Sequence, residues 1–213
     1  TDRLIALAEE ISSSPPEREL DVLLSTGEQV SIALLAMAVS ELGYEAISLT
    51  GNQVGILTDG FYSNARIVSI NNARILTELD LGKVVILAGF QGVTIDDEIT
   101  TLGRGASDTT AVAVAASLGA ERCEIYTDVD GVYTADPKIV DDAQKMELVS
   151  FEEMLELASL GSKVLHPRAV EYAANSGVTL RVLSSFTEGQ GTLITFEDMS
   201  MEQPVVSGIA HAI

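Results

Sequence analysis

Apolar residues recur along this chain with two spacings, one helical and one typical of strands. The helical spacing predicts helices over residues 4–11, 29–42, 73–79, 108–118, 151–160 and 162–175. Short apolar runs predict strands over residues 45–49, 66–70, 83–88, 122–126, 179–183 and 192–196. Because helices and strands alternate in this order, the pattern predicts an α/β sandwich.

The run Lys-Val-Val-Ile-Leu-Ala at residues 83–88 is typical of a strand buried on both faces of a parallel sheet. Gly-Phe-Gln-Gly follows it at residues 89–92, and Thr127 and Asp128 follow the strand predicted over residues 122–126. Ligands of open α/β sheets bind beyond the carboxyl ends of the strands. We therefore expect Phe90, Arg104 and Asp128 to converge at one edge of the sheet.

The most informative segment is Gly103-Arg104-Gly105, which leads into an alanine-rich predicted helix. Ser107 is expected to be the N-cap, and the loop amides with the positive end of the helix dipole favour an anion. Arg104 adds a planar fork suited to a carboxylate or a phosphate. Asp108 adds a carboxylate beside this anion site, which is favourable when a cation lies between them. The segment therefore predicts phosphate together with Mg²⁺.

Two common nucleotide motifs are excluded. Gly103 and Gly105 begin a dinucleotide fingerprint, but Asp108 takes the place of its third glycine and would face the pyrophosphate. No Gly-x-x-x-x-Gly-Lys-Ser/Thr sequence occurs in the chain. An ordinary strand-to-helix turn with a good cap remains an alternative for this segment.

Polar side chains are also dense in residues 126–138, directly after a predicted buried strand. Tyr133 offers a flat face on which adenine can stack, Asp136 can accept a hydrogen bond from ribose, and Lys138 can contact phosphate. An irregular surface loop with ordinary turn residues is the alternative.

Two isolated charges open predicted helices. Glu28 is expected at a helix start, where it either stabilises the first turn or binds the ammonium of an amino acid. Lys163 is also expected near a helix start, where a cation is unfavourable against the dipole, which hints at a phosphate contact. His166, between Leu165 and Pro167, is interpreted as a packing or hydrogen-bonding residue.

Composition narrows the possible partners. The chain has 213 residues and a formal charge of −20, which argues against nucleic acids and anionic membranes as partners. Its single cysteine, Cys123, cannot form an internal disulfide. Cys123 is expected to be a small buried apolar residue, in a protein of a reducing compartment. Two histidines and one cysteine exclude a site rich in soft metal ligands. No apolar run long enough to span a membrane and no signal peptide are visible, so the cytoplasm is expected.

Five segments, in this order, resemble the catalytic domain of aspartate kinases, in the amino acid kinase family. They are T-G-E-Q at 26–29, G-F-Q-G at 89–92, T-L-G-R-G-A-S-D-T-T-A at 101–111, Y-T-D-V-D-G-V-Y-T-A-D-P-K at 126–138 and L-G-S-K-V-L-H-P-R-A at 160–169. The resemblance implies a three-layer α/β sandwich around a mainly parallel sheet. It also implies Mg²⁺-dependent transfer of the ATP γ-phosphoryl group to the β-carboxylate of L-aspartate, for the synthesis of lysine, threonine and methionine.

The resemblance also implies a role for each matching residue. Glu28 binds the substrate ammonium and Arg104 its α-carboxylate, while Ser107 helps to hold the substrate and Phe90 lines the pocket. Asp108 corresponds to the catalytic aspartate that orients a catalytic lysine. The residues that correspond to the ATP-binding set are Thr127, Asp128, Tyr133, Asp136, Lys138 and Lys163.

The chain departs from the family pattern in two places. The family's first strand and its Lys-Phe-Gly-Gly-type loop, which carries the catalytic lysine, are missing before Thr1, so this piece is expected to be inactive although its parent protein is a kinase. Ala106 replaces the second glycine of the usual G-R-G-G-S-D, and its methyl group costs about 1 kcal/mol if that position needs a positive φ.

The expected organisation is a truncated catalytic domain over residues 1–200 and the beginning of a regulatory module over residues 201–213. A homo-oligomer, or an assembly with regulatory modules, is the expected quaternary state. Two other functions remain open, namely another acyl-phosphate or nucleotide kinase of the same family and a ligand-binding or regulatory piece without catalysis.

Overall fold

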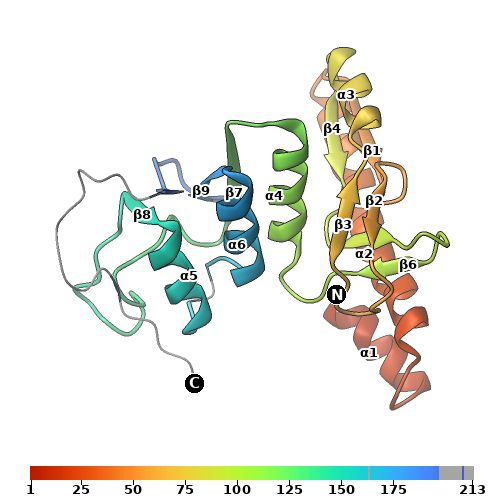
Figure 1. Cartoon of the computed structure of the whole chain (residues 1–213), viewed down its shortest axis with the longest axis horizontal. Helices are drawn as coiled ribbons and strands as arrows, with labels where there is room; N and C mark the ends of the chain where they lie inside the picture. The colour runs from red at the N-terminus through yellow and green to blue at the C-terminus, as the bar shows by residue number, and fades with distance from the viewer. Residues whose placement is uncertain (163, 197–207, 209–213) are drawn as a thin grey trace. The chain divides into compact units, whose positions relative to one another are not determined.

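The computed structural model of this chain describes residues 1–162, 164–196 and 208. The chain divides into two compact units, Thr1–Thr110 and Ala111–Ile213, with the division inside helix α4 (Ser107–Leu118). Figure 1 shows both units, with most of their helices and strands labelled. The predicted regulatory segment, residues 201–213, lies outside the described residues apart from Gly208, and it stays a prediction.

Unit 1 contains three helices besides the start of α4, and six short strands. The helices are α1 (Asp2–Ile11), α2 (Glu17–Glu41) and α3 (Ala73–Asp80). The strands are β1 (Ala46–Leu49), β2 (Ile56–Thr58), β3 (Ile67–Ile70), β4 (Val84–Leu87), β5 (Gln91–Val93) and β6 (Ile99–Thr101).

These strands form two sheets. β1 and β4 pair in parallel, with Ala46 opposite Val84. The other sheet has the order β3-β2-β5-β6, in which β2 and β5 are parallel and the outer pairs are antiparallel. Helix α2 packs against β1, β4 and β6, and α3 packs against β4. The predicted parallel strand over residues 83–88 is confirmed, but Ile86 is its buried residue and Val84 is exposed, so the expectation of burial on both faces was wrong.

Helix α2 differs most from its prediction, which placed its start near Glu28. The helix begins at Glu17, directly after Pro16, and places Gly27 and Glu28 in its middle. Gly27 lies inside the helix, where a side chain would come within 3.3 Å of Leu4 Cδ1. The glycine therefore allows α1 to pack closely, and Glu28 is not a first-turn acid.

Helix α2 is also long and apolar enough to cross a membrane by length and composition alone. The statement that no such segment exists was therefore wrong on that criterion. One such helix is weak evidence for a span, because core helices of soluble proteins pass the same test. Here Ile32 joins Ile86 and Ala88 in a small core, and the buried polar residues Asp21 and Ser25 face other parts of unit 1.

The described part of unit 2 contains a mixed sheet and two further helices. Its strands are β7 (Arg122–Thr127), β8 (Leu148–Ser150), β9 (Thr179–Ser184) and β10 (Thr192–Thr195), in the order β7-β9-β10-β8. The β7–β9 and β10–β8 pairs are parallel, and β9–β10 is antiparallel. Helices α5 (Phe151–Ser159) and α6 (Pro167–Ser176) pack against each other and against this sheet (Figure 1).

The core of unit 2 is continuous between the sheet and the helices. Met154, Leu180 and Ile194 are fully buried, and Val112 of α4 packs into the same cluster. Cys123 is buried there, as predicted. The sequence-based assignment of an α/β class is thus confirmed by helices that cover sheets in each unit.

Local signals explain where the unit 2 helices begin. Ser150 and Glu153 form a reciprocal capping box at the start of α5. Helix α6 begins at Pro167, with the His166 ring accepting a hydrogen bond from the N–H of Arg168, so the predicted helix start at residue 162 was wrong. The local hydrogen-bonding role expected for His166 is confirmed. Lys163 lies outside the described residues.

Candidate functional site

The Gly-Arg-Gly loop joins β6 to α4, and both of its ends are anchored by buried apolar residues. Gly103 and Gly105 have φ values of 90° and 73°, which glycine adopts without strain. Leu102 and Ala106 are buried together against Ala65. The loop between these two anchors is therefore fixed at its base and exposed at Arg104.

The helix after this loop begins at Ser107. Ser107 is therefore the first residue of the helix, and the prediction that it is the N-cap was wrong by one position. Asp108 occupies the first turn, as predicted, and is half-buried. Ala106 does not adopt a positive φ, and its methyl group is completely buried. The condition under which this methyl group was expected to be costly is therefore not met.

Phe90 has an unusual backbone conformation. Its φ is 68°, and such a left-handed conformation costs a bulky residue about 1–3 kcal/mol, which the surrounding structure has to supply. The Phe90 N–H donates to Thr110 Oγ1 at 3.0 Å, and its carbonyl accepts from the Leu102 N–H at 2.9 Å. A side chain at Gly89 would lie within 3.4 Å of Ser107. Residues 88–90, between β4 and β5, are called the Phe90 loop below. The contacts bring this loop, the base of the Arg104 loop and the start of α4 together.

The guanidinium of Arg104 is exposed on this loop. Its Nη2 lies 2.8 Å from Asp2 Oδ1, and the two side chains are 75% and 82% exposed. An ion pair this exposed is weak and exchanges readily with other partners. Arg104 is therefore well placed to bind the carboxylate of a ligand in place of the carboxylate of Asp2.

Glu28 is presented by the middle of α2, on the part of the helix that contacts the Phe90 loop. The side-chain amide of Gln91 is buried and donates to the carbonyl of Ser25 at 3.1 Å, less than one helical turn before Glu28. Glu28 itself is half-buried. Within unit 1 the structure thus gathers Phe90, Ser107 and the base of the Arg104 loop, and it ties the helix of Glu28 to the Phe90 loop.

The residues predicted to bind the nucleotide lie in unit 2. Thr127 ends β7, and its hydroxyl donates to Asp128 Oδ1 at 3.2 Å. Asp136 Oδ1 accepts from the backbone N–H of Lys138 at 2.9 Å, and both of these side chains are exposed. These residues therefore follow the carboxyl end of a parallel strand, where ligands of α/β sheets collect.

Tyr133 is held by two residues that sequence reasoning did not assign to the site. Its hydroxyl donates to Asp130 Oδ1 at 2.9 Å, and Lys145 Nζ lies 3.2 Å from Asp130 Oδ2. Burial raises the pKa of Asp130, but the Tyr133 hydroxyl and the Lys145 ammonium together lower it by more than burial raises it. The pKa of Asp130 therefore lies below its ordinary value. The hydrogen bond to Asp130 raises the pKa of Tyr133, which keeps the phenol neutral.

No local signal in the sequence connects Asp130 to Lys145, fifteen positions later. The connection arises because Tyr133 and Lys145 form an isolated antiparallel bridge. The predicted meeting of Asp128 with Phe90 and Arg104 joins residues of the two units and stays a prediction.

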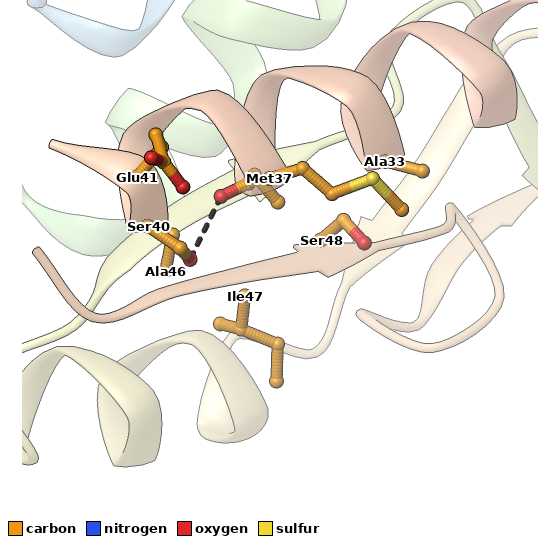
Figure 2. Close-up of a pocket in the computed structure, with 8 residues that line it drawn as sticks. Ala33, Met37, Ser40, Glu41, Ala46, Ile47 and Ser48 are labelled. Carbon is orange, nitrogen blue, oxygen red and sulfur yellow. Dashed lines mark hydrogen bonds between the residues drawn. The ribbon is translucent and has the colours of Figure 1, made fainter. Parts of the chain in front are cut away.

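The described residues contain no group of three or more His, Cys, Asp or Glu side chains that could hold a metal ion. A groove of about 570 Å³ lies between the second half of α2 and β1 (Figure 2). It is lined by small and apolar residues such as Ala33 and Met37, with Glu41 as its charged residue. With neither Lys nor Arg in its lining, this groove does not suit a phosphate or a carboxylate, and it contains none of the predicted site residues.

Comparisons with known proteins agree with the resemblance. The sequence profile of the amino acid kinase family matches residues 1–184. An aspartate kinase of Stutzerimonas stutzeri is 62% identical over 211 residues, which is 99% of this chain and 51% of that protein. The chain thus spans about half the length of this curated relative.

Two solved structures support the same relationship. The aspartate kinase from Synechocystis has a TM-score of 0.80 and 53% identity, covering 92% of this chain and 32% of that one. E. coli aspartokinase III, solved with aspartate and ADP, has a TM-score of 0.81 and 32% identity, covering 92% of this chain and 45% of that one. The predicted α/β sandwich class is confirmed by these structures.

Proposed function

Because the chain belongs to the amino acid kinase family, we propose that it forms most of the catalytic domain of an aspartate kinase. The observation that carries this proposal is the exposed guanidinium of Arg104 on a glycine loop whose base is fixed beside Phe90 and Ser107. Such a guanidinium suits the α-carboxylate of an amino acid. Glu28, on the helix tied to the same loops, suits its ammonium.

The proposed reaction transfers a phosphoryl group to a carboxylate. An oxygen of the β-carboxylate of L-aspartate forms a bond to the γ-phosphorus of ATP, and the bond from that phosphorus to the β,γ-bridging oxygen breaks, leaving its electron pair on ADP. The attacking carboxylate is already ionised near pH 7, since its ordinary pKa is about 4, so no general base is needed. Catalysis then depends on positioning and on charge neutralisation.

We assign the nucleotide to the face of unit 2 that carries Thr127, Asp128, Tyr133, Asp136 and Lys138, together with Lys163. The tether of Tyr133 to Asp130 holds its ring in one orientation, which suits stacking on adenine. Mg²⁺ enters as part of the Mg·ATP substrate, because magnesium is commonly held by substrate phosphates and few protein ligands. Asp108, in the first turn of α4, is assigned to the orientation of a catalytic lysine supplied outside this chain.

The relatives supply the wider context of this proposal. One E. coli aspartokinase III structure contains aspartate and ADP, and another contains lysine and aspartate. For the parent protein, meaning the complete gene product that contains this chain, we propose a cytoplasmic, oligomeric enzyme of lysine, threonine and methionine synthesis. Feedback control by one of these end products is part of the proposal.

The test is a turnover assay on the parent protein with ATP and each of L-aspartate, L-glutamate, N-acetylglutamate and uridine monophosphate. Hydroxylamine traps the acyl phosphate that forms when a carboxylate is phosphorylated. It does not trap phosphorylated uridine monophosphate, so the two kinds of acceptor are distinguished. We expect turnover with aspartate and at least about tenfold lower kcat/KM with the other acceptors, since a site built for two charged groups rejects ligands that misplace one. Equal or greater turnover with another acceptor would contradict the aspartate assignment.

The chain itself provides the second measurement. Calorimetry with aspartate and with Mg·ATP, beside the turnover assay, separates a catalytic parent from a ligand-binding piece. We expect the chain alone to show no turnover, because the catalytic lysine of the family pattern is absent from it. Turnover by the isolated chain would disprove the proposed role of that lysine.

A further inference from the structure

Asp21 is a completely buried carboxylate that the proposed chemistry does not use. It lies on α2 and accepts four hydrogen bonds. Its Oδ2 accepts from the backbone N–H groups of Ser63 at 2.9 Å and Thr101 at 2.8 Å. Its Oδ1 accepts from the hydroxyls of Ser63 at 3.2 Å and Thr101 at 2.6 Å. All four donors are neutral, so these bonds have to offset the cost of burying the charge.

The two donor residues belong to the segments that hold the start of the Arg104 loop. Thr101 ends β6, three positions before Arg104. Ser63 has a φ of 61°, and a side chain at Gly103 would lie 3.3 Å from Asn64 Oδ1 and 3.4 Å from the Ser63 carbonyl oxygen. The Ala65 N–H also donates to the Thr101 carbonyl at 2.9 Å. Asp21 therefore joins two segments that hold the base of the loop, the one around Ser63 and the end of β6 at Thr101, to α2.

The same face of α2 makes the other contacts of the proposed aspartate site. Asp21, Ser25 and Glu28 are spaced four and three residues apart, which places them on one face of the helix. Asp21 holds the Arg104 loop, the Ser25 carbonyl holds Gln91 beside Phe90, and Glu28 is the proposed ammonium ligand. The separation between the ammonium and carboxylate ligands thus depends on how the Arg104 loop is fixed to this helix.

We propose that Asp21 is a positioning residue that sets the position of Arg104 relative to Glu28, and thereby the binding of the amino acid substrate. This inference rests on the proposed function for its substrate, but the attachment of the loop is a property of the fold alone. Displacing a binding group by about 1 Å lowers activity by up to roughly 100-fold even when the mutation lies away from the chemistry.

Two substitutions at this position have different consequences. Asp21→Ala removes all four hydrogen bonds and so detaches Ser63 and Thr101 from α2. Asp21→Asn keeps an oxygen for the two backbone N–H groups, and its amide can donate to the hydroxyls of Ser63 and Thr101, which rotate to accept. The asparagine variant should therefore hold the loop, although it lacks the charge.

Glu78 offers a matched control in the same unit. It is also a buried carboxylate, but it is bound by the cations Arg74 at 2.7 Å and Lys83 at 2.8 Å, which lie on or next to α3. No residue of the proposed site contacts it through these bonds. Glu78→Ala should destabilise the protein without moving the Arg104 loop.

Steady-state kinetics on the parent protein test the inference, at a temperature where circular dichroism shows every variant folded. We expect Asp21→Ala to raise the KM for aspartate by about 10- to 100-fold, with the KM for ATP changed less than about twofold. Asp21→Asn should stay within about threefold of the wild type, and Glu78→Ala within about twofold. Equal increases in both KM values, or an unchanged KM for aspartate, would overturn the inference.

A second measurement does not depend on kinase activity. Trypsin cleaves after exposed arginines, so the rate of cleavage after Arg104, followed by mass spectrometry, reports on the loop. We expect faster cleavage in Asp21→Ala and an unchanged rate in Asp21→Asn and Glu78→Ala. An inactive wild-type protein would refute the proposed function and leave this result standing, whereas unchanged cleavage in Asp21→Ala would refute the positioning role alone. If Asp21→Ala does not fold, Thr101→Val, which removes one of the four bonds, should show the same cleavage effect at a smaller size.

Discussion

Removing the guanidinium of Arg104 should separate substrate binding from stability. Among the described residues its ion-pair partner is Asp2, and the side chains of Arg104 and Asp2 are 75% and 82% exposed. Exposed pairs contribute roughly 0.2–1 kcal/mol, so Arg104→Ala should lower the Tm by no more than about 4 °C. The loop should keep its position, because Leu102 and Ala106 anchor it through buried contacts.

The effect on the substrate should be much larger. Each hydrogen bond from a charged group is worth about 1.5–3 kcal/mol, and a factor of ten corresponds to about 1.4 kcal/mol. Arg104→Ala in the parent protein should therefore lower kcat/KM for aspartate by at least about tenfold and leave the KM for ATP nearly intact. Arg104→Lys should recover part of this loss, because an ammonium keeps the charge but not the planar fork.

The assay is initial-rate kinetics with aspartate and ATP varied separately, beside thermal unfolding of each variant. Arg122→Ala is the control, since Arg122 is an exposed arginine of β7 that pairs with Glu124. This control should leave both KM values unchanged. Aspartate kinetics that are the same for Arg104→Ala and the wild type would remove Arg104 from the site, and a Tm loss above about 4 °C would show that the loop depends on the guanidinium.

Three further predictions concern stability. The hydrogen bond from Lys83 lowers the pKa of Glu78, so the ionised carboxylate stabilises the fold above its ordinary pKa of about 4.3, and this stabilisation is lost as the pH falls through the lowered value. Glu78→Gln should therefore reduce the Tm near pH 7; a difference in Tm between variant and wild type that stays constant down to about pH 3 would contradict this. Ala106→Gly should cost about 1–2 kcal/mol in urea unfolding, because it removes a buried methyl group and adds chain entropy; no loss would argue against the buried cluster. Gly27→Ala should stabilise by about 0.5 kcal/mol, because Leu4 Cδ1 can shift; a lower Tm would show that α1 is packed too tightly.

The sequence predicted the regular elements well where the apolar pattern was long. Helix α4 and strands β7, β9 and β10 were placed within one residue at each end. Strands β2, β5, β6 and β8 were missed, because three residues are too short to show a period. One of them, β5, begins at Gln91, inside the Gly-Phe-Gln-Gly segment that was expected to follow the strand over residues 83–88.

The candidate site was found from sequence where its chemistry lies in one continuous segment. Arg104 and Asp108 follow directly from the glycine loop and the helix after it. Glu28 was found but was placed at a helix start, because no local signal shows that α2 continues through Gly27, which packs against Leu4 of α1. Asp21 could not be found, because its partner Thr101 is eighty positions away and nothing near Asp21 distinguishes it from a solvated helix acid.

Asp21 and Glu78 together show why burial alone does not identify a residue that matters for function. Both are buried acids of unit 1, and removing either leaves polar partners unsatisfied, so both substitutions should lower stability. Their partners differ in what they belong to. Glu78 binds Arg74 and Lys83, which lie within five positions of it, so the damage stays around α3. Asp21 binds Ser63 and Thr101, which hold the base of the Arg104 loop, so its loss reaches the residue expected to bind the substrate.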